Sequence, residues 1–236
     1  MTVADFSGAV RAFFGASEIV EAHFGGAKIW QKPAAPGGGL ELVGCSSSVS
    51  EATGGRLYFD YPAGMLPGDF AVCMLGIRNS HMVLEFDGYS AGPEFPNSSS
   101  TRVGSRVFSR VIDGTEGAQG LVVINSTNGY SAVCAVYRGA AGFGADAQVM
   151  TPSVVDPTTP GVVAMAGSLI LSIWTTSART ITPPGDGLVL GSVSTAQGCI
   201  AVEQSGPVAA GATAEHTATL GSSNYNIAAT LEILAA

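Results

Sequence analysis

Only a few side chains in this 236-residue chain could do chemistry, and they lie far apart in the sequence. The three histidines, His23, His81 and His216, share no ligand-like spacing, and no His-Glu-x-x-His pattern places two zinc-binding imidazoles on one helix face. A cysteine nucleophile needs a nearby base that lowers its pKa, and no base flanks the four cysteines. The sequence therefore predicts no catalytic histidine or cysteine.

Carboxylates are the remaining candidates for catalysis or metal binding. Two carboxylates on either side of a sugar could hydrolyse a glycosidic bond, and Glu85 with Asp87, Asp113 with Glu116, or Glu203 with any of these would supply them. Asp60 and the Asp113–Glu116 stretch could also contribute oxygens to a calcium ion, which needs about 6–8 of them. Carboxylates are nevertheless common in turns, and Asp-Gly is an ordinary turn dipeptide. We therefore predict no enzyme, no metal and no cofactor.

Recognition of carbohydrate is a third kind of chemistry that the sequence could support. Ligand sites on β-sandwiches often combine aromatic rings with amide and carboxylate groups presented by loops. Residues of this kind in loop-rich stretches are Tyr89, Phe95, Asn97, Asn125, Asn128 and Tyr130. The alternative is that these rings fill space beneath long loops, as Trp174 is expected to fill the core.

Composition narrows the class of partner. The 18 acidic and 10 basic residues give a net charge of −8, which excludes nucleic acid because phosphate binding needs clustered Lys and Arg. The sequence shows no export signal and no continuous apolar stretch long enough to cross a bilayer, so we expect synthesis in a cytoplasm and no membrane insertion. Charged residues make up only 12% of the chain, which favours a homo-oligomer that buries neutral surface over a monomer coated with Ser, Thr, Gly and Asn.

The cysteines indicate the redox state of the interior. Cys45, Cys73, Cys134 and Cys199 are widely spaced, and Cys73 and Cys134 lie in apolar, strand-like runs. Because cytoplasmic thiols stay reduced, we expect buried free thiols rather than disulfides or metal ligands.

The elements that position these residues fall into two parts of unequal length. Residues 1–32 contain two aromatic-glycine units, around Gly15 and Gly25, and each is followed by an apolar pair, which predicts two short strands or a hairpin. Such a piece is too small to be stable alone and must dock onto a partner. Its expected attachment residues are Phe13, Phe14, Phe24, Ile29 and Trp30.

A linker and a larger domain follow. Residues 33–39 contain two prolines and three glycines in a short stretch, which predicts a linker before a domain of residues 40–236. That domain is a series of apolar runs separated by turn residues, which is typical of an all-β antiparallel sandwich. The predicted strands are Leu40–Gly44, Leu57–Tyr61, Phe70–Ile77, Met82–Phe86, Arg106–Ile112, Gly120–Ile124, Ala132–Tyr137, Val162–Ala166, Leu169–Thr175, Gly187–Val193, Cys199–Gln204, Thr217–Leu220 and Ile227–Ile233.

Two halves of this domain, about 40–140 and 160–236, are similar to each other. Gly68-Asp69-Phe70 opens a long apolar run in the first half, and Gly167-Ser168-Leu169 opens one in the second. Each half also closes with a strand, a glycine-rich turn, a strand and an alanine-rich strand. This predicts a jelly-roll-like sandwich in which the halves supply equivalent strands or form two lobes, unless the similarity is chance between Ala- and Gly-rich segments.

Several motifs resemble proteins of tailed bacteriophage particles. The Phe24–Trp30 segment, Phe-Gly-Gly-Ala-Lys-Ile-Trp, is similar to the segment that opens many minor tail, baseplate and fibre proteins. Gly68-Asp69 before a strand that ends in Arg78, Val136-Tyr137-Arg138-Gly139, and Thr182-Pro183-Pro184 also resemble motifs of phage virion proteins. The Pro-Pro stretch departs from that pattern, because Gly185-Asp186-Gly187 follows it without the usual aromatic residue.

The resemblance implies a virion structural protein assembled in the host cytoplasm, docked on other virion proteins by residues 1–32 and displaying the sandwich at the tail tip, in a fibre or on the particle surface. A trimer is the expected homo-oligomer for such a projection. The alternative function is a host-surface, glycan-binding adhesin of the receptor-binding or head-spike type. A capsule depolymerase is a third and weaker alternative.

Overall fold

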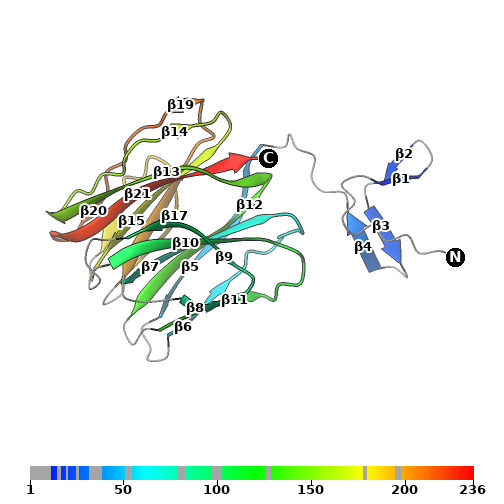
Figure 1. Cartoon of the computed structure of the whole chain (residues 1–236), viewed down its shortest axis with the longest axis horizontal. Coiled ribbons are helices and arrows are strands. Elements are labelled where there is room, and N and C mark those ends of the chain that lie inside the picture. Colours follow the sequence, from blue (N-terminus) through cyan, green and yellow to red (C-terminus); the bar gives the residue numbers. More distant parts are fainter. Residues whose placement is uncertain are drawn as a thin grey trace. The chain divides into compact units, whose positions relative to one another are not determined.

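The computed structural model describes residues 39–50, 55–78, 83–96, 103–125, 129–177, 180–194 and 198–236, together with the backbone of four short strands before residue 32. The chain divides into two compact units, Met1–Gly38 and Gly39–Ala236. In the smaller unit, β1 (Ala12–Phe14) pairs with β2 (Ser17–Ile19), and β3 (Glu21–Phe24) pairs with β4 (Ala27–Gln31), all antiparallel (Figure 1). No helix in the described part of the chain is long and apolar enough to cross a membrane.

The first half of the larger unit forms two facing antiparallel sheets. The inner sheet has five strands in the order β5-β12-β7-β10-β9, and the outer sheet has three in the order β6-β11-β8. The bounds of these strands are β5 Glu41–Ser50, β6 Arg56–Asp60, β7 Phe70–Arg78, β8 Val83–Phe86, β9 Ser90–Phe95, β10 Val103–Val111, β11 Gln119–Ile124 and β12 Tyr130–Arg138.

The second half repeats this arrangement. Its inner sheet has five strands in the order β13-β21-β15-β18-β17, and its outer layer consists of the pairs β14-β19 and β16-β20. The bounds are β13 Ala140–Val154, β14 Val163–Ala164, β15 Leu169–Thr176, β16 Ile181–Thr182, β17 Leu188–Val193, β18 Cys199–Ser205, β19 Gly211–Ala212, β20 Thr219–Leu220 and β21 Asn224–Ala235.

The two halves share one connectivity. When the five inner strands of each half are counted along the chain, both sheets have the order 1-5-2-4-3, and the outer strands arise at the same points between them. Successive strands alternate between inner and outer sheets, as in a jelly roll. The exception is that the third and fourth inner strands, β9 and β10 or β17 and β18, follow each other directly. The predicted all-β sandwich is confirmed, and its core layers are two such units in series.

The register of the central strands is also the same. Phe70 of β7 lies opposite Tyr137 of β12, and Leu169 of β15 lies opposite Ile233 of β21. Each of these two strands is preceded by a glycine with positive φ, Gly68 at 95° or Gly167 at 85°. The residue between the glycine and the strand, Asp69 or Ser168, is buried in both halves. The turn that opens each central strand is therefore built alike.

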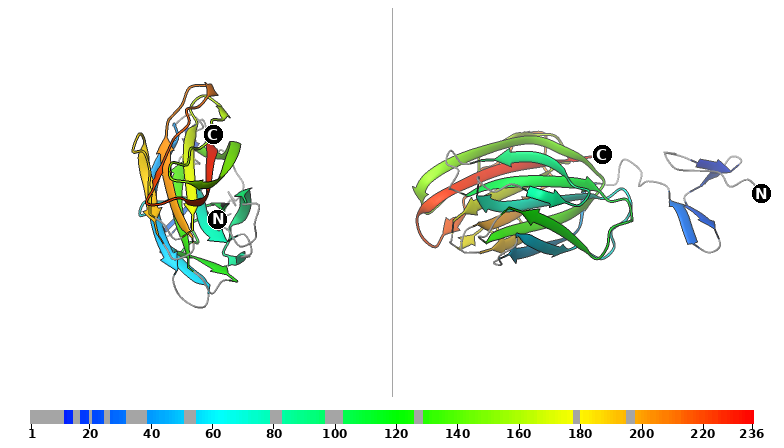
Figure 2. Two further views of the ribbon diagram at one scale, coloured as in Figure 1. Left: turned by 90° about the vertical axis from the view of Figure 1, so that its left-hand side faces the viewer. Right: turned by 60° about the horizontal axis from the view of Figure 1, so that its bottom comes forward.

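The two inner sheets pack face to face around one core (Figure 2). Alternate residues of β7 and β12 point into it from one side, and alternate residues of β15 and β21 from the other, as strand geometry requires. Its fully buried members include Val72, Met74, Leu171, Ile173 and Leu231. The sheets are stacked so that the first strand of each half lies over the third strand of the other, β5 over β17 and β13 over β9.

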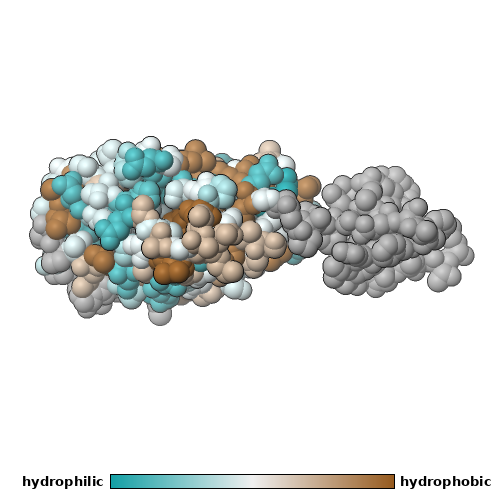
Figure 3. Space-filling model, turned by 90° about the horizontal axis from the view of Figure 1, so that it is seen from above, coloured by the Kyte–Doolittle hydropathy of each residue, from teal (hydrophilic) through white to brown (hydrophobic). Residues whose placement is uncertain are grey.

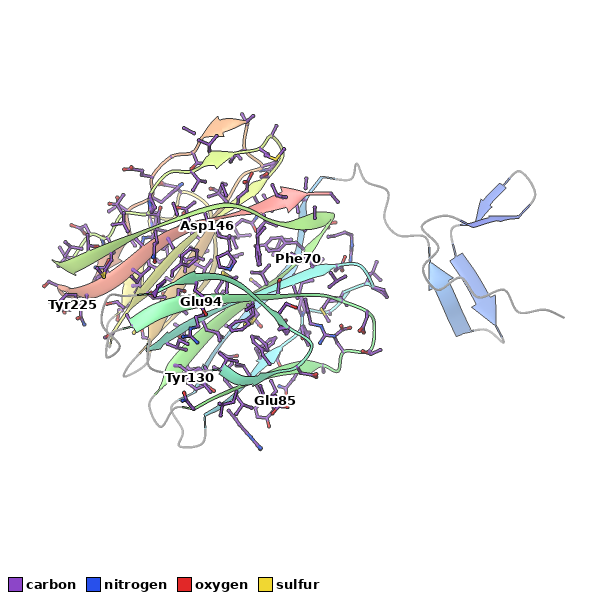
Figure 4. The ribbon with its side chains drawn as sticks, viewed as in Figure 1. Phe70, Glu85, Glu94, Tyr130, Asp146 and Tyr225 are labelled. Atoms are coloured by element: carbon purple, nitrogen blue, oxygen red, sulfur yellow. A yellow bond between two sulfur atoms is a disulfide. The ribbon has the colours of Figure 1, made fainter. Side chains whose placement is uncertain are left out.

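Contacts at both edges follow this pseudo-two-fold arrangement. Gly191 of β17 lies against Ser47 and Val133, so the second half covers β5 and β12. At the opposite edge, the ring of Phe143 on β13 fills the space beside Gly92 of β9. Phe143 also makes an edge-to-face contact with Phe70, which is labelled in Figure 4, with 5.4 Å between the ring centroids. Each edge of the sandwich is thus closed by residues of both halves.

Strands β9 and β13 were not predicted from the sequence. β9 contains Gly92 and Pro93, and β13 contains Gly142 and Gly144 and has three register irregularities against β21. Both are edge strands, where Pro, Gly and bulges are tolerated because one side of the backbone needs no sheet partner. The second half therefore begins with a strand at Ala140, before the expected boundary near residue 160.

Cys73 and Cys134 form a disulfide, which corrects the expectation of free thiols at these positions. They lie directly opposite each other on β7 and β12, with their Cα atoms 4.1 Å apart, and both side chains face the core beneath the outer sheet. Cys199 is buried and forms no disulfide, as predicted, whereas Cys45, which also forms no disulfide, is exposed on β5.

We predict that the native chain, unfolded without reductant, reacts with a thiol reagent at two cysteines, Cys45 and Cys199. Unfolding with reductant should expose four thiols, and peptide mapping should locate the additional two at Cys73 and Cys134. Four reactive thiols without reductant would contradict the disulfide.

Candidate functional site

The aromatic residues proposed for carbohydrate binding lie in the interior. Phe95 is 1% exposed and belongs to the core between the inner sheets, while Tyr130 is fully buried under the outer sheet of the first half. The Tyr130 hydroxyl donates a hydrogen bond to the Gly55 carbonyl oxygen at 2.5 Å. These two rings fill space, so the alternative interpretation holds for them.

Tyr89 belongs to an aromatic cluster under the same outer sheet. Its ring stacks on Phe86 with 4.0 Å between centroids, and Phe59 meets both rings edge to face. The Arg110 guanidinium lies 5.9 Å from the Tyr89 ring centroid. Burial raises the pKa of Tyr89 far above its ordinary value, and the ring does not face solvent as a binding platform would.

The other predicted site residues are only partly placed. Asn125 is exposed at the end of β11, whereas Asn97 and Asn128 lie outside the described residues. The attachment residues fall on the small strands: Phe13 and Phe14 on β1, Phe24 on β3, and Ile29 and Trp30 on β4. Their side chains lie outside the described part, so attachment through them stays a prediction.

The Asp113–Glu116 stretch is a closed turn. The Glu116 carboxylate accepts the Asp113 and Gly114 amides and pairs with Arg110 at 2.6 Å. The Asp113 carboxylate accepts hydrogen bonds from the hydroxyl and the backbone amide of Thr115. These hydrogen bonds lower the pKa of the exposed Asp113 carboxyl. These oxygens are engaged by donors of the turn itself. Among the described residues, no group of three or more His, Cys, Asp or Glu side chains could hold a metal ion.

Two sequence motifs from the phage resemblance meet in the structure. Arg138 at the end of β12 forms a two-pronged ion pair with Asp69 at the start of β7, with N–O distances of 3.1 and 3.0 Å. Asp69 also accepts the Leu66 amide, and Arg138 donates to the Gly64 carbonyl oxygen. The pair fixes the turn that opens β7, which is a structural role.

Two buried carboxylates of the second half bind backbone amides. Glu203 on β18 accepts the Gly185 and Gly187 amides at 2.9 and 2.6 Å and so holds the loop that follows Pro183-Pro184. Glu232 on β21 accepts the Ala145 and Met165 amides at 2.8 and 2.6 Å. Glu203 and Glu232 are each only 2% exposed, so neither carboxylate is accessible for catalysis.

One match to a catalytic pattern stands against the prediction of no enzyme. Residues 88–92 read Gly-Tyr-Ser-Ala-Gly and fit the Gly-x-Ser-x-Gly pattern of serine hydrolases. That pattern acts through a tight turn from a strand into a helix, which exposes the serine hydroxyl. Here Ser90 is the first residue of the edge strand β9, opposite Ser109 of β10, and no helix follows. The local structure is therefore not a nucleophile elbow.

A shallow hollow lies near the β9 edge of the first inner sheet, where β7, β10 and β9 are neighbours. It is lined by residues that include Ile77, Glu94 and Arg106, and its volume is about 100 Å³. Typical small-molecule sites measure roughly 300–1,000 Å³. The Arg106–Glu94 ion pair, 3.6 Å between Nε and Oε1, crosses its lining. The hollow could hold a few water molecules but no sugar ring.

The solvent face of the outer sheet β6-β11-β8 offers a better candidate site. Tyr58 is 52% exposed there and is the one aromatic side chain classed as exposed among the described residues. It lies opposite Leu121, and in the next rung the Gln119 side-chain amide donates to the Asp60 carboxylate at 2.8 Å. Exposed Arg56 and Glu85, the latter labelled in Figure 4, complete a flat face with one ring and several hydrogen-bonding groups.

This face could not be predicted directly from the sequence. Tyr58 falls within a predicted strand, and its exposure depends on which side of the strand meets the inner sheet. The alternation Arg56-Leu57-Tyr58-Phe59-Asp60 is the only local signal, because it places the charged ends and Tyr58 on one side. Comparison with known proteins adds no relative: no family model, no curated protein and no solved structure matches this chain.

Replacing Glu232 by Gln should destabilise the larger unit by about 1–3 kcal/mol at neutral pH. A glutamine side chain has one oxygen where the carboxylate has two, so the Ala145 or the Met165 amide would lose its acceptor. Burial raises the pKa of Glu232, but the hydrogen bonds it accepts outweigh burial, so the net pKa lies below its ordinary 4.5. A carboxyl whose pKa is lower in the folded chain than in the unfolded chain stabilises the fold at pH values above its unfolded-state pKa. This stabilisation is lost as the pH falls through the folded-state pKa.

Denaturant unfolding should be measured from neutral pH down to a pH below the folded-state pKa of Glu232. The free energy of unfolding should fall less over this interval in E232Q than in wild type. Glu85→Gln, at an exposed position on β8, controls for the loss of one negative charge. Equal stability of E232Q and wild type at neutral pH would contradict the role assigned to Glu232.

Proposed function

We propose that this chain is a structural protein of a tailed-bacteriophage particle, in which residues 1–32 attach to other virion proteins and the larger unit is displayed. The observation that carries the proposal is the division into two compact units at Gly38, with the phage-like Phe24–Trp30 segment in the smaller one. That segment includes the last residue of β3 and most of β4, and these two strands pair antiparallel. A short paired segment joined in sequence to a much larger sandwich suits a division of the chain into an attachment part and a displayed part.

The architecture of the larger unit supports display. Two jelly-roll-like halves bury one common core, so the body needs no partner in order to cover its inner sheets. Its buried carboxylates bind loops instead of substrate, and Asp69 and Arg138 hold a turn. Assembly through weak contacts repeated over many copies would then supply avidity.

Deleting residues 1–32 should abolish incorporation of the protein into phage particles while leaving the larger unit folded. Quantitative mass spectrometry of purified particles measures the copies per particle, and circular dichroism of the isolated variant confirms its β content. The double substitution Phe24→Ala with Trp30→Ala, in the full chain, should reduce incorporation in the same direction. Normal copy number in the deletion variant would refute attachment through this segment.

A second candidate function is recognition of a host-surface glycan, which the face around Tyr58 favours. An exposed ring can stack on the apolar face of a sugar, while Asp60, Gln119 and Arg56 surround it with donors and acceptors for hydroxyl groups. Under this proposal the ligand platform is the outer sheet of the first half and not the loops proposed from the sequence.

Tyr58→Ala should weaken binding to a glycan array or to host cells at least tenfold, which corresponds to about 1.4 kcal/mol. Val111→Ala is the matched control, because Val111 is 62% exposed at the end of β10, away from the β6-β11-β8 face. Undiminished binding by Y58A would remove this face as the site, and the absence of binding by wild type would remove the adhesin function.

A further inference from the structure

The outer layer of the second half carries an apolar surface at β14 and β19. Val163 is 75% exposed and Met165 is 64% exposed, and they are the two most exposed large hydrophobic residues of the described chain. Small apolar residues surround them. The β14–β19 patch consists of the exposed residues Val163, Met165, Ala166, Pro207, Ala209, Ala210 and Ala212.

These residues form one continuous surface. Val163 pairs with Ala212, and the Gly167 amide donates to the Val208 carbonyl oxygen at 2.9 Å, so residues 162–168 run antiparallel to residues 207–213. β14 and β19 lie at the top of the larger unit in Figure 1, and Figure 3, which looks down on that side, shows brown and tan residues gathered there with teal ones around them. A contiguous exposed apolar patch of this kind marks an interaction surface.

The equivalent surface of the first half shows that the fold does not require this composition. There the outer strands β6 and β11 expose Arg56, Asp60 and Gln119 around Tyr58. The same layer is therefore polar and charged in one half, while the β14–β19 patch contains no charged residue. The apolar character belongs to this surface specifically.

The backbone beneath the patch is held in place. The buried Glu232 carboxylate accepts the Met165 amide at 2.6 Å and ties it to β13 through the Ala145 amide. Val162, Ala164 and Ile170 pack underneath in a small core of their own. The patch is thus a preorganised surface, which reduces the entropy lost on binding.

We propose that the β14–β19 patch binds the same patch on a second copy of this chain. The chain carries a net charge of −8, so most contacts between two copies bring like charges together. In a two-fold contact the residues near the axis meet their own counterparts, where a charge would face its like, so the centre of such a contact favours a surface without charges. The β14–β19 patch meets this condition, whereas the equivalent face of the first half does not.

This dimer rests on the proposed display function only for the role of the pairing. The contact itself is inferred from the exposed residues and their lack of charge. A patch that meets its own counterpart closes as a dimer, in place of the trimer expected for a projecting spike. Pairing would fix two displayed bodies side by side through surfaces far in sequence from residues 1–32.

Sedimentation velocity of the full-length chain over a concentration series tests this contact. Wild type should be a dimer, and Val163→Asp with Met165→Asp should raise the dimer dissociation constant by roughly a hundredfold, because each copy then brings two negative charges to an apolar contact. The milder pair Val163→Thr with Met165→Gln should shift it in the same direction. Leu84→Asp is the matched control, because Leu84 is 61% exposed in the outer layer of the other half.

A monomeric or trimeric wild type would overturn the proposal, and so would equal dissociation by L84D. Cross-linking locates the contact: in a Cys45→Ser background, Ala212→Cys should form disulfide-linked dimers on mild oxidation, whereas Leu84→Cys should not. A chain that dimerises in this way yet is missing from particles would refute the virion role alone. A chain that is incorporated but stays monomeric would refute the pairing alone.

Discussion

The structure depends on the burial of one apolar layer between two five-stranded sheets. Among the residues that the structure describes, eighteen buried side chains fill that layer, and the two halves of the chain each supply one wall of it. Burying a large apolar side chain contributes about 1.5–3 kcal/mol, and the conformational entropy lost on folding offsets much of the sum. Separating the sheets would expose both walls to water at once, so each half stabilises the other, and the pseudo-two-fold arrangement matches two walls of the same topology.

The inner faces of both halves are buried against each other and stay apolar, whereas the outer layers of the two halves differ in composition. The outer sheet of the first half covers an aromatic cluster and presents Tyr58 among charged and amide groups. The outer pairs of the second half cover smaller cores and present the uncharged β14–β19 patch, held from beneath by Glu232. The proposed display and contact functions therefore both fall on outer surfaces, which two halves of the same topology support with different side chains.

The all-β class and the central strands could be predicted because their apolar residues are dense and follow turn-forming glycines such as Gly68 and Gly167. The edge strands β9 and β13 could not, because an edge tolerates Pro93, Gly142 and Gly144, which argue against a strand in any local window. The Cys73–Cys134 disulfide depends on the register of β7 against β12, and the exposure of Tyr58 depends on what packs beneath it. Both are properties of the tertiary structure and leave little trace in neighbouring residues.

Native-state hydrogen exchange with increasing denaturant, followed by mass spectrometry, tests most directly whether the halves share one core. Amides of β7 and β12 in the first half and of β15 and β21 in the second should exchange at one common free energy, because losing either wall exposes the other. Complete exchange of β7 and β12 at a denaturant concentration where β15 and β21 remain protected would contradict the account, since it would show that one half folds without the other.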